Sequence, residues 1–299
     1  MSESNTFKIE PWVLTQRQGL PLDIKVKMTQ RRIKQWYEGQ DGAVYVSFSG
    51  GKDSTVLLHL VRSMYPEVPA VFIDTGLEYP EIRDFVKTFD NVVWLKPALS
   101  FKGVIEKYGY PVVSKENAQK IHEIRNTKSD KLMHKRLYGD EKGNGKLSKK
   151  WRILIAAPFN TSHKCCDVLK KSPVKKYERM SGLYPFVGTM AEDSSLRRLA
   201  YLRKGCNAFD TKRPTSTPLM FWKEDDIWNY LKNNDIPYSK IYDMGYTRTG
   251  CMFCMFGVNI QPEPNKFMVM AKTHPAQWNY CINKLGCGRV MDFIGVKYK

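Results

Sequence analysis

The stretch from residue 45 to residue 60 reads Tyr45-Val46-Ser47-Phe48-Ser49-Gly50-Gly51-Lys52-Asp53-Ser54-Thr55-Val56-Leu57-Leu58-His59-Leu60. An apolar strand runs here into a tight glycine turn and then into a helix with apolar periodicity. Glycines let the backbone approach an oxyanion closely, and the start of a helix attracts negative charge. The stretch therefore predicts a phosphate-binding turn, to which Lys52 adds a positive charge.

The spacing of this turn differs from the Walker loop, Gly-x-x-x-x-Gly-Lys-Ser/Thr, and from the dinucleotide turn, Gly-x-Gly-x-x-Gly. The string Ser49-Gly50-Gly51-Lys52-Asp53-Ser54 resembles the PP-loop of the adenine nucleotide alpha hydrolase superfamily. The resemblance implies that ATP or an adenylyl compound binds here and reacts at its α-phosphorus. It implies catalytic roles for Lys52 and Asp53 and nucleotide-binding roles for Ser47, Ser49, Gly50, Gly51, Lys52, Asp53 and Ser54.

Helical and strand patterns alternate around the turn. Strand patterns cover residues 43–48, 70–74 and 92–95, and helical patterns cover residues 25–37, 53–64 and 80–89. Right-handed crossovers between parallel strands place helices on both faces of a sheet and the ligand at the carboxyl ends of the strands. We therefore expect an α/β fold with a doubly wound, mainly parallel sheet.

Three segments are expected along the chain. Residues 1–24 form an N-terminal extension, residues 25–245 form the nucleotide-binding α/β domain, and residues 246–299 form a C-terminal segment that carries a Cys-x-x-Cys motif.

The second expected strand ends in the polar run Asp74-Thr75-Gly76-Leu77-Glu78-Tyr79-Pro80-Glu81. This run emerges at the same sheet edge as the glycine turn, and Asp74, Thr75 and Gly76 are candidates to contact the nucleotide. An ordinary capped loop is the alternative. The run resembles the matching segment of the phosphoadenosine phosphosulfate (PAPS) reductase family.

Four cysteines form two pairs, Cys165-Cys166 and Cys251-x-x-Cys254. In a reducing compartment, four thiolates suit zinc or an iron-sulfur cluster. The pairs resemble those of the plant and bacterial adenosine 5′-phosphosulfate (APS) reductases, which implies a [4Fe-4S] cluster. Zinc and buried thiols without a metal stay open. Cys206, Cys281 and Cys287 have no partner at ligand spacing and are expected as small buried side chains.

The segment from Phe186 to Arg198 matches the family in position more than in chemistry. Ser194 and Arg197 keep the family spacing as anion binders, and Gly188 and Arg197 are candidate nucleotide contacts. Sulfonucleotide reductases carry an arginine pair and a glutamine after the glycine. Here Met190 and Ala191 replace the arginines and Asp193 replaces the glutamine. A carboxylate at this place suits a magnesium ion that bridges ATP phosphates, although an exposed turn is the alternative.

The C-terminal region departs from the family. Assimilatory reductases attack sulfur with the cysteine of a Glu-Cys-Gly-x-His string, whereas this chain has Gly286-Cys287-Gly288-Arg289. Cys287 is therefore a candidate nucleophile by partial match only. Lys284 and Arg289 are the neighbouring charges that would lower its pKa.

The formal net charge of +18 is spread over several segments, which are Lys25–Arg32, Lys128–Lys150, Lys164–Lys176 and Arg197–Arg213. Distributed positive charge attracts polyanions such as tRNA or DNA. A solvated basic surface that draws a small nucleotide to its cleft is the alternative.

The chain has 299 residues, of which 42% are hydrophobic, enough for a substantial core. No run of about 18 apolar residues appears, and Met1–Thr6 lacks the basic-then-apolar order of a secretory signal. We expect a cytoplasmic protein without a membrane segment.

Three functions follow. The first is an ATP pyrophosphatase-type enzyme, which activates an oxygen for replacement by sulfur, with nucleic acid as one acceptor class and a sulfur donor protein as partner. The second is an APS or PAPS reductase in which Cys287 forms a thiosulfonate that thioredoxin resolves. The third is a nucleotide sensor without catalysis. The absent arginine pair and the positive charge favour the first.

Overall fold

The computed structural model describes residues 8–299 and divides the chain into two compact units. Unit 1 comprises the chain up to Ile73 together with Tyr79–Leu95 and Lys175–Arg248. Unit 2 comprises Asp74–Glu78, Lys96–Val174 and Thr249–Lys299. Residues 1–7, the start of the expected extension, lie outside the described residues. The division at 1–24, 25–245 and 246–299 stays a prediction.

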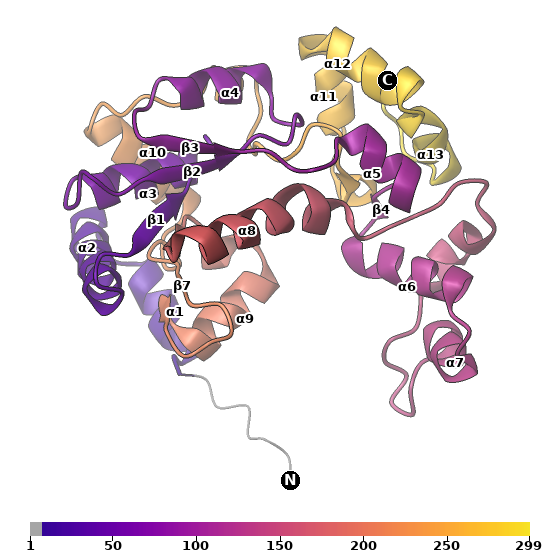
Figure 1. Ribbon diagram of the computed structural model, residues 1–299, viewed down its shortest axis with the longest axis horizontal. Helices are drawn as coiled ribbons and strands as arrows, with labels where there is room; N and C mark the ends of the chain where they lie inside the picture. The colour runs from indigo at the N-terminus through magenta and orange to yellow at the C-terminus, as the bar shows by residue number, and fades with distance from the viewer. Residues whose placement is uncertain (1–7) are drawn as a thin grey trace. The chain divides into compact units, whose positions relative to one another are not determined.

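Unit 1 is built on a six-stranded sheet with the order β3-β2-β1-β5-β7-β6 (Figure 1). The strands are β1 (Val44–Ser47), β2 (Ala70–Ile73), β3 (Val92–Leu95), β5 (Tyr184–Val187), β6 (Asn207–Ala208) and β7 (Thr215–Ser216). Every pairing is parallel except that of β6 with β7. The mainly parallel α/β fold is thereby confirmed.

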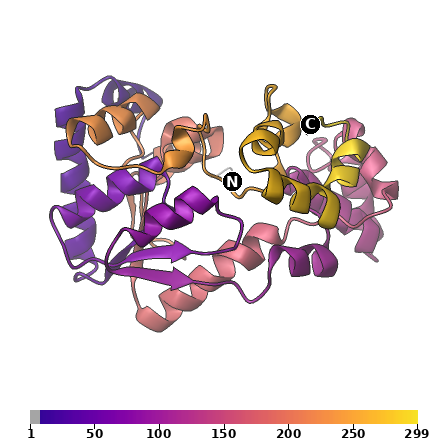
Figure 2. The ribbon, with the colours of Figure 1, turned by 90° about the horizontal axis from the view of Figure 1, so that it is seen from above.

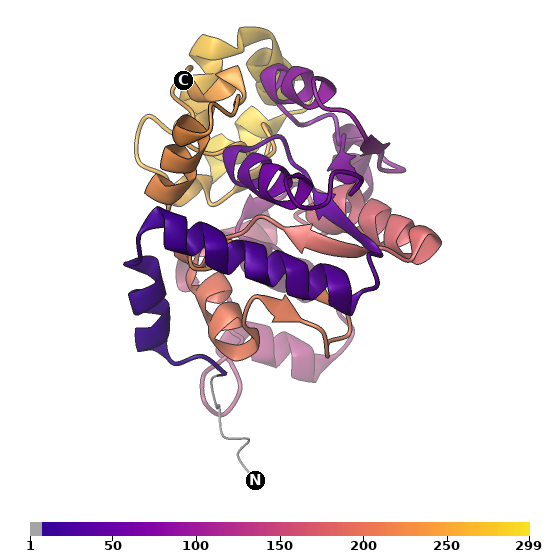
Figure 3. The ribbon, with the colours of Figure 1, turned by 90° about the vertical axis from the view of Figure 1, so that its left-hand side faces the viewer.

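Helices cover both faces of this sheet. Figure 2 shows α3 and α4 on one face of the strands and α8 on the other, and α1 and α2, in indigo, are nearest the viewer in Figure 3. The helices are α1 (Pro11–Gln18), α2 (Leu22–Gly39), α3 (Lys52–Arg62), α4 (Pro80–Lys87), α8 (Ser172–Ser181), α9 (Ser195–Lys204) and α10 (Glu224–Asn233). The boundary between the units falls within α8.

The strands have apolar runs because both faces of a parallel sheet are buried. Val44, Tyr45 and Val46 of β1 are each at most 1% exposed. Val46 faces Ala70 of β2 on one side and Phe186 of β5 on the other. β1 therefore lies in the centre of the sheet, and the glycine turn follows directly from this buried strand.

Unit 2 is mostly helical, with a two-stranded parallel sheet of β4 (Val112–Val113) and β8 (Met255–Phe256). Its α-helices are α5 (Phe101–Tyr108), α6 (Lys115–Asn126), α7 (Asp130–Tyr138), α11 (Lys266–Thr273), α12 (Pro275–Asn279) and α13 (Cys287–Phe293). A short π-helix, η2 (Asp167–Lys171), follows the first cysteine pair. Over residues 8–299, no helix combines the length and the apolar character that crossing a bilayer requires.

Candidate functional site

The strand order reverses direction beside β1. The chain passes from β1 to β2 and β3 on one side and later returns to β5 on the other. In open parallel sheets, ligands bind outside the carboxyl ends of the strands at such a switch point. The turn at residues 48–51 follows β1, and Gly188 follows β5. Two of the segments that the sequence singled out therefore lie at the expected edge.

Two glycines are required by close packing at this edge. Gly50 has φ +72°, and an added Cβ there would lie 2.7 Å from Cγ2 of Val86 in α4. An added Cβ at Gly188 would lie 3.0 Å from the carbonyl oxygen of Asp53. The loop after β5 thus packs directly against the start of α3. Gly50 is needed to seat the turn on α4 in addition to any contact with a ligand.

Hydroxyl groups hold the turn in shape. The Ser54 hydroxyl accepts a hydrogen bond from the Ser49 amide at 3.1 Å and donates to the Gly51 carbonyl at 2.9 Å. The Gly51 amide donates to the Ser49 hydroxyl at 3.3 Å, and the Thr55 hydroxyl also bonds the Gly51 carbonyl. These bonds form a compact, pre-shaped loop at the amino end of a helix, where an anion is favoured.

Lys52 is buried and already has partners. Its Nζ lies 3.1 Å from a carboxylate oxygen of Glu224 and donates to the Thr247 carbonyl at 3.2 Å. The same ammonium lies 5.8 Å from the ring centre of Trp228 and 5.5 Å from that of Tyr242. A phosphate that approaches Lys52 therefore competes with Glu224, whose side chain is half exposed.

Asp53 carries a buried oxygen, Oδ1, that accepts no hydrogen bond among the residues the structure describes. Lys52 Nζ lies 3.9 Å from it. Burial raises the pKa of the Asp53 carboxyl, and the negative charges of Asp193 and Glu224 add to the rise, against the opposing charges of Lys52 and Arg197. The carboxylate is thus held in an environment that would favour a further cation.

Asp193 and Arg197 neutralise each other. Asp193 accepts a hydrogen bond from the Met190 amide at 2.9 Å, is paired with the Arg197 guanidinium, and lies 3.7 Å from Arg248. Arg197 was expected to bind an anion, but its guanidinium group forms an ion pair with Asp193. Ser194 caps α9 by accepting from the Arg197 amide at 3.3 Å.

Hydrogen bonds within residues 74–78 hold the segment after β2 in shape. The Thr75 amide and hydroxyl both donate to the Glu78 carboxylate at 2.9 Å, and the Gly76 amide donates to Asp74 at 3.2 Å. This segment belongs to unit 2. The roles expected for Asp74, Thr75 and Gly76 at a nucleotide stay a prediction.

The four paired cysteines come together in unit 2. Cys165 is 7% exposed, and the other three are half-buried. Burial raises the pKa of the Cys165 thiol, and the charges of Cys166, Cys251 and Cys254 raise it further, which places all four groups within electrostatic reach. The Met252 amide, inside the second pair, donates to the Leu77 carbonyl at 2.8 Å. The cysteines therefore adjoin the Asp74–Glu78 segment.

Two half-buried lysines, Lys170 and Lys266, flank the cysteines. Burial acts to lower the pKa of Lys170, but the charges of Cys251 and Glu78 outweigh it and raise that pKa. Lys266 donates from Nζ to the Cys251 carbonyl at 3.2 Å. Thiolates with cationic neighbours suit a soft metal group. Within residues 8–299, however, no three His, Cys, Asp or Glu side chains are close enough to hold one metal ion.

The remaining cysteines are buried, as expected. Cys281 and Cys287 are both fully buried, and the neighbouring Cys287 thiol together with burial raises the pKa of the Cys281 thiol. Cys206 is 6% exposed in unit 1. Cys287 begins α13 and exposes no sulfur to a substrate. The role of Cys287 as a nucleophile stays a prediction that its burial does not favour.

Sequence reasoning missed the side chains around Lys52. Glu224, Trp228 and Tyr242 meet Lys52 only through tertiary packing. The acidic first turn of α10 was visible in the sequence, but no local signal connects it with Lys52.

A protein-family model identifies the family of this chain. Residues 43–136 and 115–256 match the family model described as the phosphoadenosine phosphosulfate reductase domain. An uncharacterized protein of Methanocaldococcus jannaschii is 28% identical over 85% of this chain, which spans about half (51%) of that relative's length. An adenosine 5′-phosphosulfate reductase of Geobacillus kaustophilus is 25% identical over 82% of this chain and 86% of its own. Among solved structures, a PAPS reductase of Candida auris gives a TM-score of 0.44 at 15% identity, covering 82% of this chain and 97% of that one.

Proposed function

Because the chain belongs to the phosphoadenosine phosphosulfate reductase family, we propose that it is an enzyme that binds ATP at the turn after β1 and releases pyrophosphate from it. The family match agrees with the expectation of an enzyme. The choice of ATP over a sulfonucleotide is made from the residues at the switch point and from the position of Cys287.

The observation that carries the proposal is the acidic environment at the ends of β1 and β5. Asp53 keeps a buried oxygen without a hydrogen bond within the described residues, and Asp193 and Glu224 act on the same carboxylate. Oxygen donors of this kind suit Mg²⁺, which usually binds one or two carboxylates together with substrate phosphates. Asp193 also occupies Arg197 in an ion pair, which leaves that arginine less able to bind the anionic end of a sulfonucleotide.

The residues of this chain would have the following roles in binding ATP. The pre-shaped turn and Lys52 would bind phosphate oxygens. The phosphate would displace the Glu224 carboxylate from Lys52. Asp53 and Asp193 would hold a magnesium ion, which neutralises charge on the phosphates when it is bound. Gly188 keeps the loop after β5 against the backbone of Asp53, so both carboxylates stay at one edge.

The proposed reaction requires no added oxidant. An acceptor oxygen attacks the α-phosphorus, the new O–P bond forms, and the bond to the β-phosphate breaks with its electron pair leaving on pyrophosphate. A sulfide equivalent from a donor then replaces the activated oxygen and releases AMP. The acceptor is one that carries a replaceable oxygen, and nucleic acid is the class that the net charge of +18 favours.

An iron-sulfur cluster at Cys165, Cys166, Cys251 and Cys254 is part of the proposal. The four thiols are within electrostatic reach of one another, and Lys170 would offset their negative charge as thiolates. When bound, the cluster would supply a soft metal site beside the Asp74–Glu78 segment. Anaerobically purified protein should show broad brown absorbance and contain iron, and Cys165→Ser should lose both while Cys206→Ala keeps them. A colourless wild-type protein would exclude the cluster.

One observation favours a second candidate, an APS reductase with thioredoxin as its partner: the 25% identity to the Geobacillus kaustophilus APS reductase over 82% of the chain. The full burial of Cys287 counts against it, because a nucleophile must reach the sulfur of the substrate.

A direct assay separates the two candidates. The anaerobically purified protein is incubated with ATP, APS and PAPS separately, and pyrophosphate and sulfite are measured. We expect pyrophosphate from ATP, and a decrease when Mg²⁺ is chelated. Sulfite release from either sulfonucleotide, with no pyrophosphate from ATP, would establish the reductase instead. Cys287→Ser should abolish sulfite release in a reductase and leave pyrophosphate release unchanged.

A further inference from the structure

A basic cavity lies at the β6 edge of unit 1, away from the turn after β1. Its volume is about 450 Å³. It is lined by residues from the segment before α1, from α1 and α2, and from the end of α9 and the region of β6, and four of them are cationic: Lys8, Arg17, Arg32 and Lys204. Among residues 8–299, no Asp or Glu lines it. β6 is separated from β1 by β7 and β5, so this cavity is a different place from the switch point.

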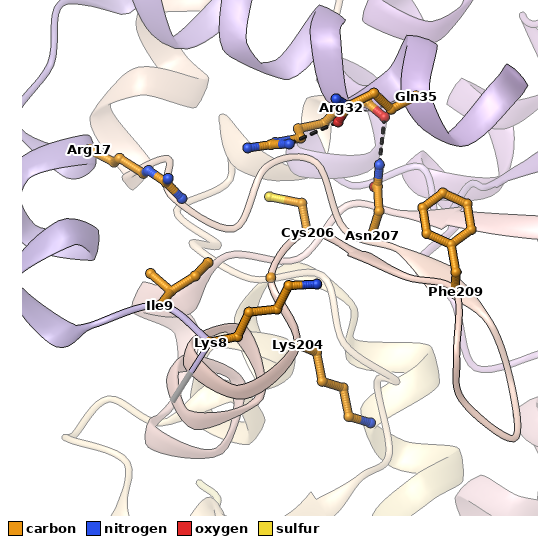
Figure 4. Close-up of a pocket in the computed structure, with 10 residues that line it drawn as sticks. Lys8, Ile9, Arg17, Arg32, Gln35, Lys204, Cys206, Asn207 and Phe209 are labelled. Atoms are coloured by element: carbon orange, nitrogen blue, oxygen red, sulfur yellow. Dashed lines mark hydrogen bonds between the residues drawn. The ribbon is translucent and has the colours of Figure 1, made fainter. Parts of the chain in front are cut away.

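The two arginines at this cavity have neutral partners. Arg17 donates to the Tyr201 hydroxyl at 2.7 Å, and Arg32 donates to the Gln35 side-chain oxygen at 2.8 Å. Within residues 8–299, none of the four cations forms an ion pair with a carboxylate. Figure 4 shows the guanidinium groups of Arg17 and Arg32 directed toward the same space beside the Cys206 thiol. Two arginines that converge without a carboxylate form a site for an anion, and guanidinium groups match phosphate oxygens.

An aromatic side chain lies at the same cavity. Phe209 is 38% exposed, and its ring packs on that of Trp36 with ring centres 4.7 Å apart. A supported aromatic ring beside phosphate-binding cations is the combination that single-stranded nucleic acids use, with a base on the ring and the backbone on the charges. A free inorganic anion would make no use of the ring.

Helix α9 connects this cavity with the switch point. It begins after Ser194, next to Asp193, whose charge acts on Asp53, and it ends at Lys204 in the cavity wall. The helix has ten residues and so is about 15 Å long. Its basic side chains Arg198, Arg203 and Lys204 are exposed, whereas the exposed Arg197 is paired with Asp193, and the helix contains no acidic residue. Positive charge therefore continues from the cavity toward the candidate catalytic edge.

We propose that this cavity, defined by Arg17, Arg32, Lys204 and Phe209, binds a phosphodiester group of a single-stranded nucleic acid that lies along α9. The proposal rests on the proposed function for the idea that this strand is the acceptor of sulfur. The binding itself requires neither ATP nor the cysteines.

The test measures binding without nucleotide, by fluorescence anisotropy of labelled single-stranded RNA and DNA of the same sequence, about 12 nucleotides long. We compare wild type with Arg32→Gln, which loses a cavity guanidinium, and with Arg31→Gln, which loses the same charge from an exposed position on the same helix outside the cavity wall. Lys204→Gln is the second cavity variant.

Arg32→Gln should weaken binding about tenfold and lower the slope of log affinity against log salt by about 0.7, the value for one lost phosphate contact on a single strand. Arg31→Gln should change affinity less than twofold. Equal effects of the two variants, or no binding of either oligonucleotide, would overturn the proposal. The RNA and DNA arms identify which backbone is preferred. Pyrophosphate release from ATP is measured in parallel, so that a failed cavity and a failed ATP reaction are told apart.

Discussion

The pairing of Lys52 with Glu224 sets how strongly the turn binds a phosphate. The ammonium is buried against Trp228 and Tyr242, and the carboxylate 3.1 Å away is its charged partner on the exposed side. A phosphate that replaces Glu224 gains the charge of Lys52 but must first separate this pair. Because the Glu224 side chain is half exposed, solvent screens this ion pair, and the pair contributes only about 0–1 kcal/mol to the stability of the folded protein.

Glu224→Gln should therefore tighten ATP binding about two- to fivefold, since the competing carboxylate is removed. Calorimetric titration with ATP measures the change, and Asp225→Asn, which removes the neighbouring acid of the same helix turn, is the matched control and should leave affinity unchanged. Weaker binding by Glu224→Gln would show instead that Glu224 holds a metal ion or the substrate.

The Asp53 carboxylate is expected to lower the stability of the folded protein at neutral pH while it supports the proposed reaction. Burial raises its pKa in the folded protein above the ordinary value of 3.8, so the folded state binds a proton more tightly than the unfolded state. Stability from this group is then lost as pH rises from 3.8 through the raised pKa, and at neutral pH the charged carboxylate is a net cost.

Asp53→Asn should raise the melting temperature at pH 7 and lower pyrophosphate release by roughly a hundredfold. The difference in stability between the variant and wild type should shrink as pH falls toward 3.8. Thermal unfolding over a pH series measures it. A variant that is less stable than wild type at pH 7 would contradict the assigned cost.

At the scale of elements, the loop after β5 and the start of α3 depend on one another. An added Cβ at Gly188 would lie 3.0 Å from the Asp53 carbonyl oxygen and 3.2 Å from its carbonyl carbon, and backbone atoms cannot move aside as a flexible side chain can.

Gly188→Ala should therefore destabilise the protein by about 1–3 kcal/mol and weaken ATP binding, because the loop must move away from the turn. Denaturant unfolding and titration measure the two effects. Gly19→Ala is the control, since the nearest atom to its added Cβ is at an ordinary 3.5 Å. Unchanged ATP affinity in Gly188→Ala would mean that the loop takes no part in the nucleotide site.

The elements that position the turn were predictable because their signals are local. The apolar runs at residues 43–48, 70–74 and 92–95 became β1, β2 and β3, and the helix expected from residue 53 is α3, Lys52–Arg62. The strands β6 and β7, of two residues each, carry too few positions for a periodicity to show. The partners of Lys52 could not be predicted, because α10 meets α3 only through tertiary packing.

At the scale of the whole molecule, the cysteine set joins three segments that are distant in sequence. The pair at Cys165 and Cys166, the pair at Cys251 and Cys254, and the Asp74–Glu78 segment lie together in unit 2, and the Met252 amide bonds the Leu77 carbonyl. The sequence identified the two pairs by spacing. The sequence predicted nucleotide contacts for Asp74, Thr75 and Gly76, with a capped loop as the alternative, because nothing local indicates that this segment also adjoins the cysteines.

A cluster bound by these cysteines would stabilise unit 2 locally, since metal binding free energy becomes folding free energy for the segments it joins. Removing it, by Cys165→Ser, should speed hydrogen exchange of the Met252 amide at least about tenfold, because that amide is protected only while the segments stay together. The amides of Val46 and Phe48, which donate to Pro69 and Val71 in the β1–β2 ladder of unit 1, should keep their exchange rates. Exchange measured by NMR or mass spectrometry, with Cys206→Ala as the control, separates the two regions. If hydrogen exchange of the Val46 and Phe48 amides accelerates as much as that of the Met252 amide, the loss of stability is global. The cysteines would then stabilise the whole chain rather than the segments beside them.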